Sequence, residues 1–192
     1  MSHNLSSGVT ADIDGTGYRV ALVCARFNDL IVNRLRDGAI DALVAHGVAA
    51  ADITTIWIPG ALEAPQAVRA ACDSGRFDAV IALGTVIRGD TYHFEIVAET
   101  SALGIDRVAT SSPVAVTNGI LTVDTVEQAD VRSADLRQLG ADTDAARDDV
   151  GDSADTADAD ITTDAPVLTN KGAEAALAAL DLAATLAALR AP

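Results

Sequence analysis

Four apolar runs rich in β-branched residues recur along the chain, and each is followed by a segment with helical spacing. They are Tyr18–Cys24, Ile53–Ile58, Ala79–Leu83 and Val114–Thr122. Strands that alternate with helices form a parallel sheet with helices on both faces, because their crossover connections are right-handed. The pattern therefore predicts an α/β fold, a three-layer α/β/α sandwich around one parallel sheet.

The length and composition of the chain favour one domain with an acidic insertion. With 192 residues, 49% of them hydrophobic, the chain can bury the core of one α/β domain, which we assign to residues 18–192. Residues 1–17 are polar and glycine-bearing, so we expect a flexible N-terminal arm or, alternatively, a strand added to a neighbouring subunit. Nine aspartates and few apolar residues fall in about 140–166, where we expect a disordered insertion.

The formal net charge of −15 excludes two classes of partner. Such a surface repels nucleic-acid phosphates and anionic membranes. The acidic residues are mostly aspartate and Lys171 is the only lysine, which favours a cytoplasm with very high salt, as in a halophilic archaeon. The alternative is that the acidic insertion alone accounts for the charge.

The sequence also bears on location and cofactors. No basic segment followed by an apolar run marks the N-terminus, and no uncharged apolar run reaches membrane-spanning length, so we expect a cytoplasmic protein. Cys24 and Cys72 lie in apolar surroundings and are expected to be buried thiols. No metal-ligand cluster or nucleotide fingerprint is present in the sequence, so we expect neither a metal nor a cofactor.

Three loops follow the first three predicted strands and should meet at one edge of the sheet, where open α/β sheets bind ligands. The first loop carries Phe27, whose ring could stack on a flat substrate. The third loop carries Gly84 and Gly89, which permit close backbone approach, and opens a helix predicted over Phe94–Leu103, whose free amides favour an anion. His93 lies there with an unperturbed pKa of roughly 6.5, which suits proton transfer. The alternative is a glycine turn with a helix cap at Asp90 or Thr91 and a merely packed histidine, and this stretch alone does not separate the two.

Six blocks of the sequence resemble the 6,7-dimethyl-8-ribityllumazine synthase family, in that family's order and near its spacing. The blocks are Ala25–Asn28, Ile58–Glu63, Gly84–His93, Gly119–Thr122, Glu127–Ala129 and Asn170–Ala176. The resemblance implies a flavodoxin-like fold and condensation of 5-amino-6-ribitylaminouracil with 3,4-dihydroxy-2-butanone 4-phosphate, without cofactor or metal. It also implies a homo-oligomer, a pentamer or a sixty-subunit shell, with the site between subunits and with riboflavin synthase as a further partner.

The resemblance assigns roles by position. It places Phe27 against the pyrimidine ring and makes His93 the proton donor and acceptor. The positions that match the ribityl contacts are Asn28, Ala61, Leu62 and Glu63; those that match pyrimidine-edge contacts are Val86 and Ile87; and those that match the phosphate loop are Gly89, Asp90 and Thr91.

Three further residues match the part of the family's pocket that a neighbouring subunit supplies or that binds phosphate. Arg132 matches the phosphate-binding arginine, although the insertion disturbs the register and Arg137 is a competing candidate. Lys171 lies in a matching motif, and Asn118 stands where the family usually has an aromatic. Arg88 is expected to be structural.

Two other functions stay open at this stage. One is an archaeal-type riboflavin synthase, which dismutates two lumazines; the motif blocks around His93 and Lys171 favour the condensing enzyme instead. The other is a non-catalytic flavin-binding shell protein on the same scaffold. Retention of Phe27, Glu63 and His93 argues against it, whereas Asn118 leaves it possible.

Overall fold

The sheet has four parallel strands in the order β2-β1-β3-β4, as the computed structural model shows for residues 13–135 and 168–190. The strands are β1 (Val20–Ala25), β2 (Ile53–Ile58), β3 (Ala79–Ile87) and β4 (Ala115–Val123). The order is that of an open sheet in which the chain reverses its winding direction between β1 and β3. Ligands bind such sheets at the carboxyl ends of the strands beside that point.

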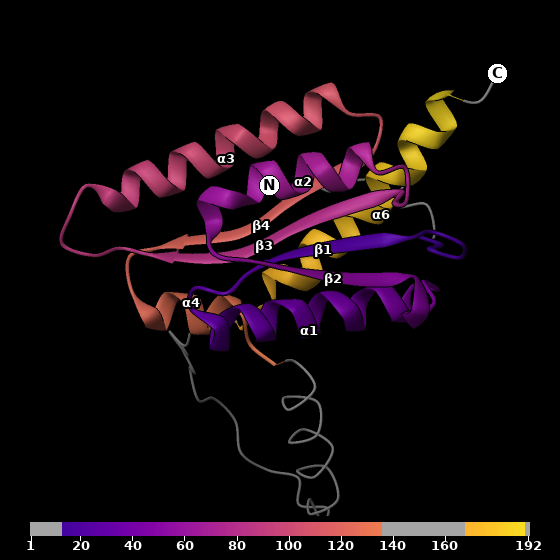
Figure 1. Ribbon diagram of the computed structural model, residues 1–192. Helices are drawn as coiled ribbons and strands as arrows, with labels where there is room; N and C mark the ends of the chain where they lie inside the picture. Colours follow the sequence, from indigo (N-terminus) through magenta and orange to yellow (C-terminus); the bar gives the residue numbers. More distant parts are fainter. Residues whose placement is uncertain (1–12, 136–167, 191–192) are drawn as a thin grey trace, which may run out of the picture.

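Helices cover both faces of this sheet (Figure 1). They are α1 (Asp29–Ala45), α2 (Ala64–Asp73), α3 (His93–Ser111), α4 (Val126–Arg132) and α6 (Lys171–Arg190), with single 3₁₀ turns η1 (Ala50–Asp52) and η2 (Ala61–Glu63). Helices α1 and α6 pack together on one face, and α2 and α3 pack together on the other. The predicted α/β/α sandwich of flavodoxin-like type is therefore confirmed.

Two apolar clusters, one on each face of the sheet, form the core. Leu22, Leu35 and Leu180 are fully buried in the cluster beneath α1 and α6. Val23 and Val68 are fully buried in the cluster beneath α2 and α3. Every residue of β1 is buried, because strands flank it on both edges and helices cover both faces.

Strand β3 is longer than the sequence predicted. It was expected to end at Leu83 with a glycine loop beginning at Gly84, but Gly84–Ile87 continue the strand by pairing with Ile120–Val123 of β4. Gly84 therefore belongs to the sheet and not to an open turn, and a Cβ there would make ordinary contact with Ala25 Cβ (3.4 Å). The loop itself begins only at Arg88.

Helix α3 also corrects two expectations. It was predicted to run from Phe94 to Leu103, but it begins at His93 and continues to Ser111. The residue at its N-cap is Tyr92, and no side chain caps it, so the alternative with Asp90 or Thr91 as the cap is wrong.

The two described segments that flank the insertion lie side by side. The Thr169 amide donates to the Val131 carbonyl (2.9 Å), and the Ala134 amide donates to the Thr169 carbonyl (3.0 Å). The buried Asn170 side chain donates to the Ala134 carbonyl (3.0 Å) and accepts from the Ala173 amide (3.1 Å) at the start of α6. The chain therefore returns to the point where it left the domain, while the acidic segment at 140–166 and Arg137 lie outside the described residues.

Two other expectations concern the ends of the chain. The described part of the predicted N-terminal arm contacts the domain, because the Gly15 amide donates to the His46 carbonyl (2.6 Å) and Ile13 packs against the core.

Helix α6 is long and apolar enough to cross a membrane by length and composition alone. Its apolar side nevertheless packs in the core, where Ala176 and Leu180 are fully buried.

Candidate active site

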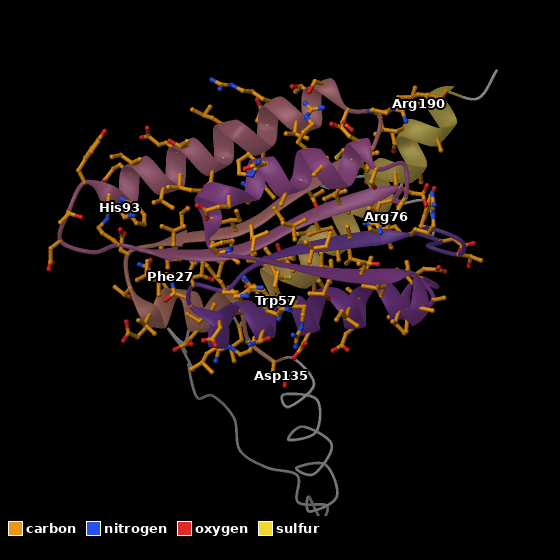
Figure 2. All side chains as sticks on the ribbon, in the orientation of Figure 1. Phe27, Trp57, Arg76, His93, Asp135 and Arg190 are labelled. Carbon is orange, nitrogen blue, oxygen red and sulfur yellow. The ribbon has the colours of Figure 1, made fainter. Side chains whose placement is uncertain are left out.

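A cavity of about 420 Å³ opens at the carboxyl ends of β1, β2 and β3. The three loops that follow these strands all contribute to it, so the predicted convergence of the loops is confirmed. The predicted site residues that line it are Phe27, Asn28, Ala61, Leu62, Glu63, Val86, Ile87, Gly89, Thr91 and His93. Figure 2 shows Phe27 and His93 at this end of the molecule, with Arg190 at the opposite end.

The Phe27 ring is open to solvent at the mouth of the cavity. Its exposed fraction is 74%, which excludes a role in the core. Its neighbour Asn28 adopts a left-handed backbone conformation (φ 61°, ψ 44°) at the start of α1. No side chain caps this helix, and the Asn28 amide group donates to the Thr85 carbonyl (2.9 Å).

The loop after β2 folds into the 3₁₀ turn η2 before α2 begins. Pro65 lies in the first turn of α2, because only there does a missing N–H cost nothing. The Glu63 carboxylate folds back over Gly60, where a Cβ would lie 3.2 Å from Oε2. The sequence therefore places one exposed carboxylate on the wall of the cavity that His93 also lines.

The loop Arg88–Tyr92 leads from β3 into α3. Gly89, Asp90 and Thr91 are exposed, and a Cβ on Gly89 would meet nothing within 4 Å. Within the described chain, the His93 ring makes no hydrogen bond, and it faces the cavity from the first residue of α3. The free amides of this helix end and an unengaged imidazole are thus together at one place, which suits an anionic group that must exchange protons.

Four predicted site residues do not line this cavity. Asp90, predicted as part of the phosphate loop, is one of them. Asn118, Arg132 and Lys171 line a different hollow of about 430 Å³ along the free edge of β4. In a single chain the candidate site is therefore divided between two surfaces.

The three residues of this second hollow make only local contacts in the described structure. Arg132 Nη1 donates to the Gln128 carbonyl (3.0 Å) one turn earlier in α4. Lys171 Nζ donates to Glu174 Oε2 (2.7 Å), and Asn118 Oδ1 accepts from the Ile120 amide (3.0 Å). Both cations lie on the surface and remain accessible to a ligand.

Five residues of the cavity wall were not among the predicted site residues: Pro59, Gly60, Thr85, Phe94 and Val97. Phe94 follows His93 and lines the cavity, and its signal was an aromatic in the first turn of the helix. Thr85 is buried, and its hydroxyl has no hydrogen-bond partner in the described part of the chain. Thr85 directly precedes Val86 and Ile87, the two predicted pyrimidine contacts, so its place beside them was the available signal.

Metal and thiol chemistry have little support in the described residues. Among them, no group of three or more histidine, cysteine or acidic side chains could hold a metal ion. Cys24 and Cys72 are free and buried, as predicted. Burial raises the pKa of the Cys24 thiol to about 12, so it stays protonated near neutral pH.

Open parallel sheets bind small molecules at the carboxyl ends of their strands, and this cavity occupies that place. The chain is thus an α/β protein of flavodoxin-like fold with a small-molecule pocket between three strand-to-helix loops.

Comparison with known proteins identifies the family. The family model for 6,7-dimethyl-8-ribityllumazine synthase matches residues 17–187. The 6,7-dimethyl-8-ribityllumazine synthase of Cupriavidus necator is 46% identical over 132 residues, which cover 69% of this chain and 78% of that protein. The protein of the same name from Gemmatimonas aurantiaca is 47% identical over 129 residues, covering 67% of this chain and 79% of that protein. The chain belongs to the 6,7-dimethyl-8-ribityllumazine synthase family, a family of transferases in riboflavin biosynthesis.

Proposed function

We propose that this chain condenses 5-amino-6-(D-ribitylamino)uracil with 3,4-dihydroxy-2-butanone 4-phosphate to 6,7-dimethyl-8-ribityllumazine, phosphate and water. One observation carries the proposal: in a chain of this family, an exposed aromatic ring, a carboxylate and an imidazole beside a helix N-terminus surround one cavity. The reaction joins a flat pyrimidine to a short phosphorylated ketone, and the cavity offers a surface suited to each.

The pyrimidine half of the cavity is formed by the first two loops and the end of β3. Phe27 stacks on the ring, and the backbone at Val86 and Ile87 binds its polar edge. The ribityl chain extends along Asn28 and the turn Ala61–Glu63, where the Glu63 carboxylate accepts hydrogen bonds from its hydroxyls. The support is that all these residues line the same cavity.

The phosphate half lies at the loop Gly89–Thr91. Backbone amides at the start of α3 hold the phosphate group, since a helix N-terminus attracts anions. His93 relays the protons that imine formation, phosphate elimination and ring closure require. Holding both substrates together supplies much of the remaining acceleration, so no covalent intermediate on the protein is needed.

A second copy of the chain completes the site in this proposal. Asn118, Arg132 and Lys171 lie in their own hollow on the β4 edge, and a neighbouring subunit would bring this hollow to the mouth of the first cavity. Arg132 then pairs with the phosphate. The exposed apolar residues Leu30 and Tyr92 beside the cavity support such an interface, and we propose a pentamer or a sixty-subunit shell.

The setting of the enzyme is part of the proposal. The aspartate-rich, lysine-poor composition suits a cytoplasm with high salt, where screening reduces self-repulsion at a net charge of −15. The halophilic archaeal origin remains a prediction, since the relatives described above are bacterial. Riboflavin synthase, which consumes the lumazine, is the proposed further partner.

Mixing both substrates with the protein in high salt, without added metal or cofactor, tests the activity. Lumazine absorbance and fluorescence should appear only when both substrates are present. Formation of riboflavin from lumazine alone would instead identify a riboflavin synthase. Flavin binding without turnover would identify a non-catalytic protein on this scaffold.

A further inference from the structure

Arg88 connects three separate segments at the edge of the cavity. Its Nε donates to Asp124 Oδ1 (2.7 Å) just after β4, and its Nη1 donates to Glu95 Oε1 in the first turn of α3. Its backbone amide donates to the Val123 carbonyl (2.9 Å). Arg88 is itself the first residue of the loop that we assign to the phosphate, so the side chain ties the beginning of this loop to the helix at its end.

The guanidinium also contacts the wall of the cavity. Its central carbon lies 4.0 Å from the centroid of the Phe94 ring, within the range of a cation–π interaction. Phe94 lines the cavity directly after His93. Arg88 therefore restrains both the loop and the side chain next to the histidine, although it does not line the cavity itself.

The charge of Arg88 is already matched by its partners. The hydrogen bonds to Asp124 and then to Glu95 raise the pKa of Arg88, and the hydrogen bond from Arg88 lowers the pKa of Glu95. Two carboxylates surround one guanidinium, so this group has little net charge to offer a phosphate. Arg88 is therefore suited to holding the loop in position rather than to attracting the phosphate.

We propose that Arg88 is a positioning residue, which sets the loop Gly89–Tyr92 and the Phe94 ring for binding of the phosphorylated substrate. The inference rests on the proposed function for the identity of that substrate. A planar guanidinium can donate to two carboxylates in fixed directions while its flat face stacks on a ring, whereas an ammonium has no flat face to stack. Loss of this group should loosen the loop and leave the pyrimidine half of the cavity unaffected.

The test compares Arg88→Met, Arg88→Lys and a control, Arg69→Met. Arg69 makes a comparable set of surface interactions on α2, with Asp73 (3.6 Å) and with Ser111 Oγ (2.5 Å), but does not line the cavity. The readouts are KM for the butanone phosphate, fluorescence titration of the pyrimidine, and hydrogen exchange of the amides of residues 89–92. The exchange measurement needs no substrate.

Arg88→Met should raise KM for the butanone phosphate by about tenfold, on the scale expected when two surface ion pairs and one cation–π interaction are removed together. Hydrogen exchange of the amides of residues 89–92 should become faster, while the affinity for the pyrimidine should stay unchanged. Arg88→Lys should partly restore both the KM and the slow exchange. If Arg88→Met does not fold, Asp124→Asn removes one of the two ion pairs and serves for the same comparison.

Unchanged KM and unchanged exchange in a folded Arg88→Met would overturn the inference, as would equal losses for both substrates or the same losses in Arg69→Met. Failure of the proposed function has a different signature, since the wild-type protein would then form no lumazine at all. In that case the exchange data alone still decide whether Arg88 holds the loop.

Discussion

The side-chain amide of Asn28 donates a hydrogen bond of 2.9 Å to the backbone carbonyl of Thr85, across 57 positions of sequence. It joins the loop after β1 to the last part of β3, where the cavity lies. Asn28 reaches this carbonyl from a left-handed backbone conformation, which asparagine tolerates better than most residues. One residue thus shapes the loop that presents Phe27 and fixes it to the neighbouring strand.

Substitution of Asn28 should separate the contribution of its left-handed backbone conformation from that of its hydrogen bond to Thr85. Asn28→Gly keeps the backbone conformation and loses the hydrogen bond, with an expected cost of about 0.5–1.5 kcal/mol in the free energy of unfolding. Asn28→Ala also strains the backbone, which adds roughly 1–2 kcal/mol. Denaturant unfolding at a fixed protein concentration measures both values. Equal stability of the two variants would contradict the assigned conformation.

Arg132→Ala should raise KM for the butanone phosphate far more than the KM for the pyrimidine. The reason is that a charge-assisted arginine–phosphate contact is worth roughly 1.5–3 kcal/mol, or at least about tenfold in affinity. Arg137→Ala is the matched control, because Arg137 competes for the same role by sequence. Steady-state kinetics with each substrate varied in turn provides the measurement. If Arg137→Ala shows this pattern and Arg132→Ala does not, the register across the insertion is wrong.

Local sequence pattern identified the four strands and the converging loops, but not where pairing and packing extend an element. Gly84 resembled the start of a turn, yet its place in β3 depends on pairing with β4. The helix predicted to end at Leu103 continues through Gly104 to Ser111, and Gly104 lets α3 approach α2, since a Cβ there would lie 2.5 Å from Pro65 Cγ. The pairing of Gly84 and the packing of Gly104 both involve segments far away in the sequence.

The candidate site was predictable to a similar extent. The alternation of strands and helices along the chain was enough to place the loops that carry Phe27, Glu63 and His93 at one edge of the sheet. The hydrogen bond between Asn28 and Thr85 could not be predicted from the sequence, because a polar residue after a strand has many partners within reach. The sequence also did not predict that Arg132 lines a different hollow from His93, because the distance between two surface residues depends on how the whole chain folds.

Asp78 should make the stability of the protein depend on pH. Burial opposes its ionisation, but hydrogen bonds from the Arg19 side chain (3.2 Å) and backbone amide (2.9 Å) prevail, so the pKa of Asp78 lies below its usual value. A carboxyl with a depressed folded-state pKa stabilises the protein above its unfolded-state pKa of about 3.9, and this contribution is lost as pH falls through the folded-state value.

Asp78→Asn should therefore lower Tm at neutral pH, by no more than about 4 °C because solvent screens this partly exposed pair. The difference from wild type should close as pH falls below about 4. Asp73→Asn is the control, since its pair with Arg69 is longer and its side chain more exposed. Thermal unfolding at several pH values tests this, and a difference that widens in acid would contradict it.

Light scattering should show a pentamer or a larger assembly as the active species in high salt. Leu30 and Phe27 expose 79% and 74% of their surface beside the cavity, and burial in an interface would remove this apolar area from water. Leu30→Asp should therefore shift the protein towards smaller species and reduce turnover. Leu189→Asp is the control, since Leu189 is similarly exposed (77%) next to Arg190 at the opposite end of the molecule (Figure 2). An active monomer would refute the assembly.

His93→Ala should lower kcat without abolishing turnover. Proton relay by a positioned imidazole is typically worth about 10²–10⁴-fold, and we expect the low end because both substrates are reactive once held together. The His93 ring makes no hydrogen bond in the described chain, so its removal leaves no buried group unpaired and should spare the fold.

Pyrimidine binding should also survive in His93→Ala, because stacking on Phe27 and the backbone contacts of β3 do not involve the imidazole. The decisive comparison sets kcat of this variant beside a fluorescence titration of the pyrimidine. Complete loss of turnover with intact binding would show that His93 does more than relay protons, and unchanged turnover would show that it takes no part. A modest loss confined to kcat is the result expected of a proton relay, since such a group acts in the transition state and not in the binding of either substrate.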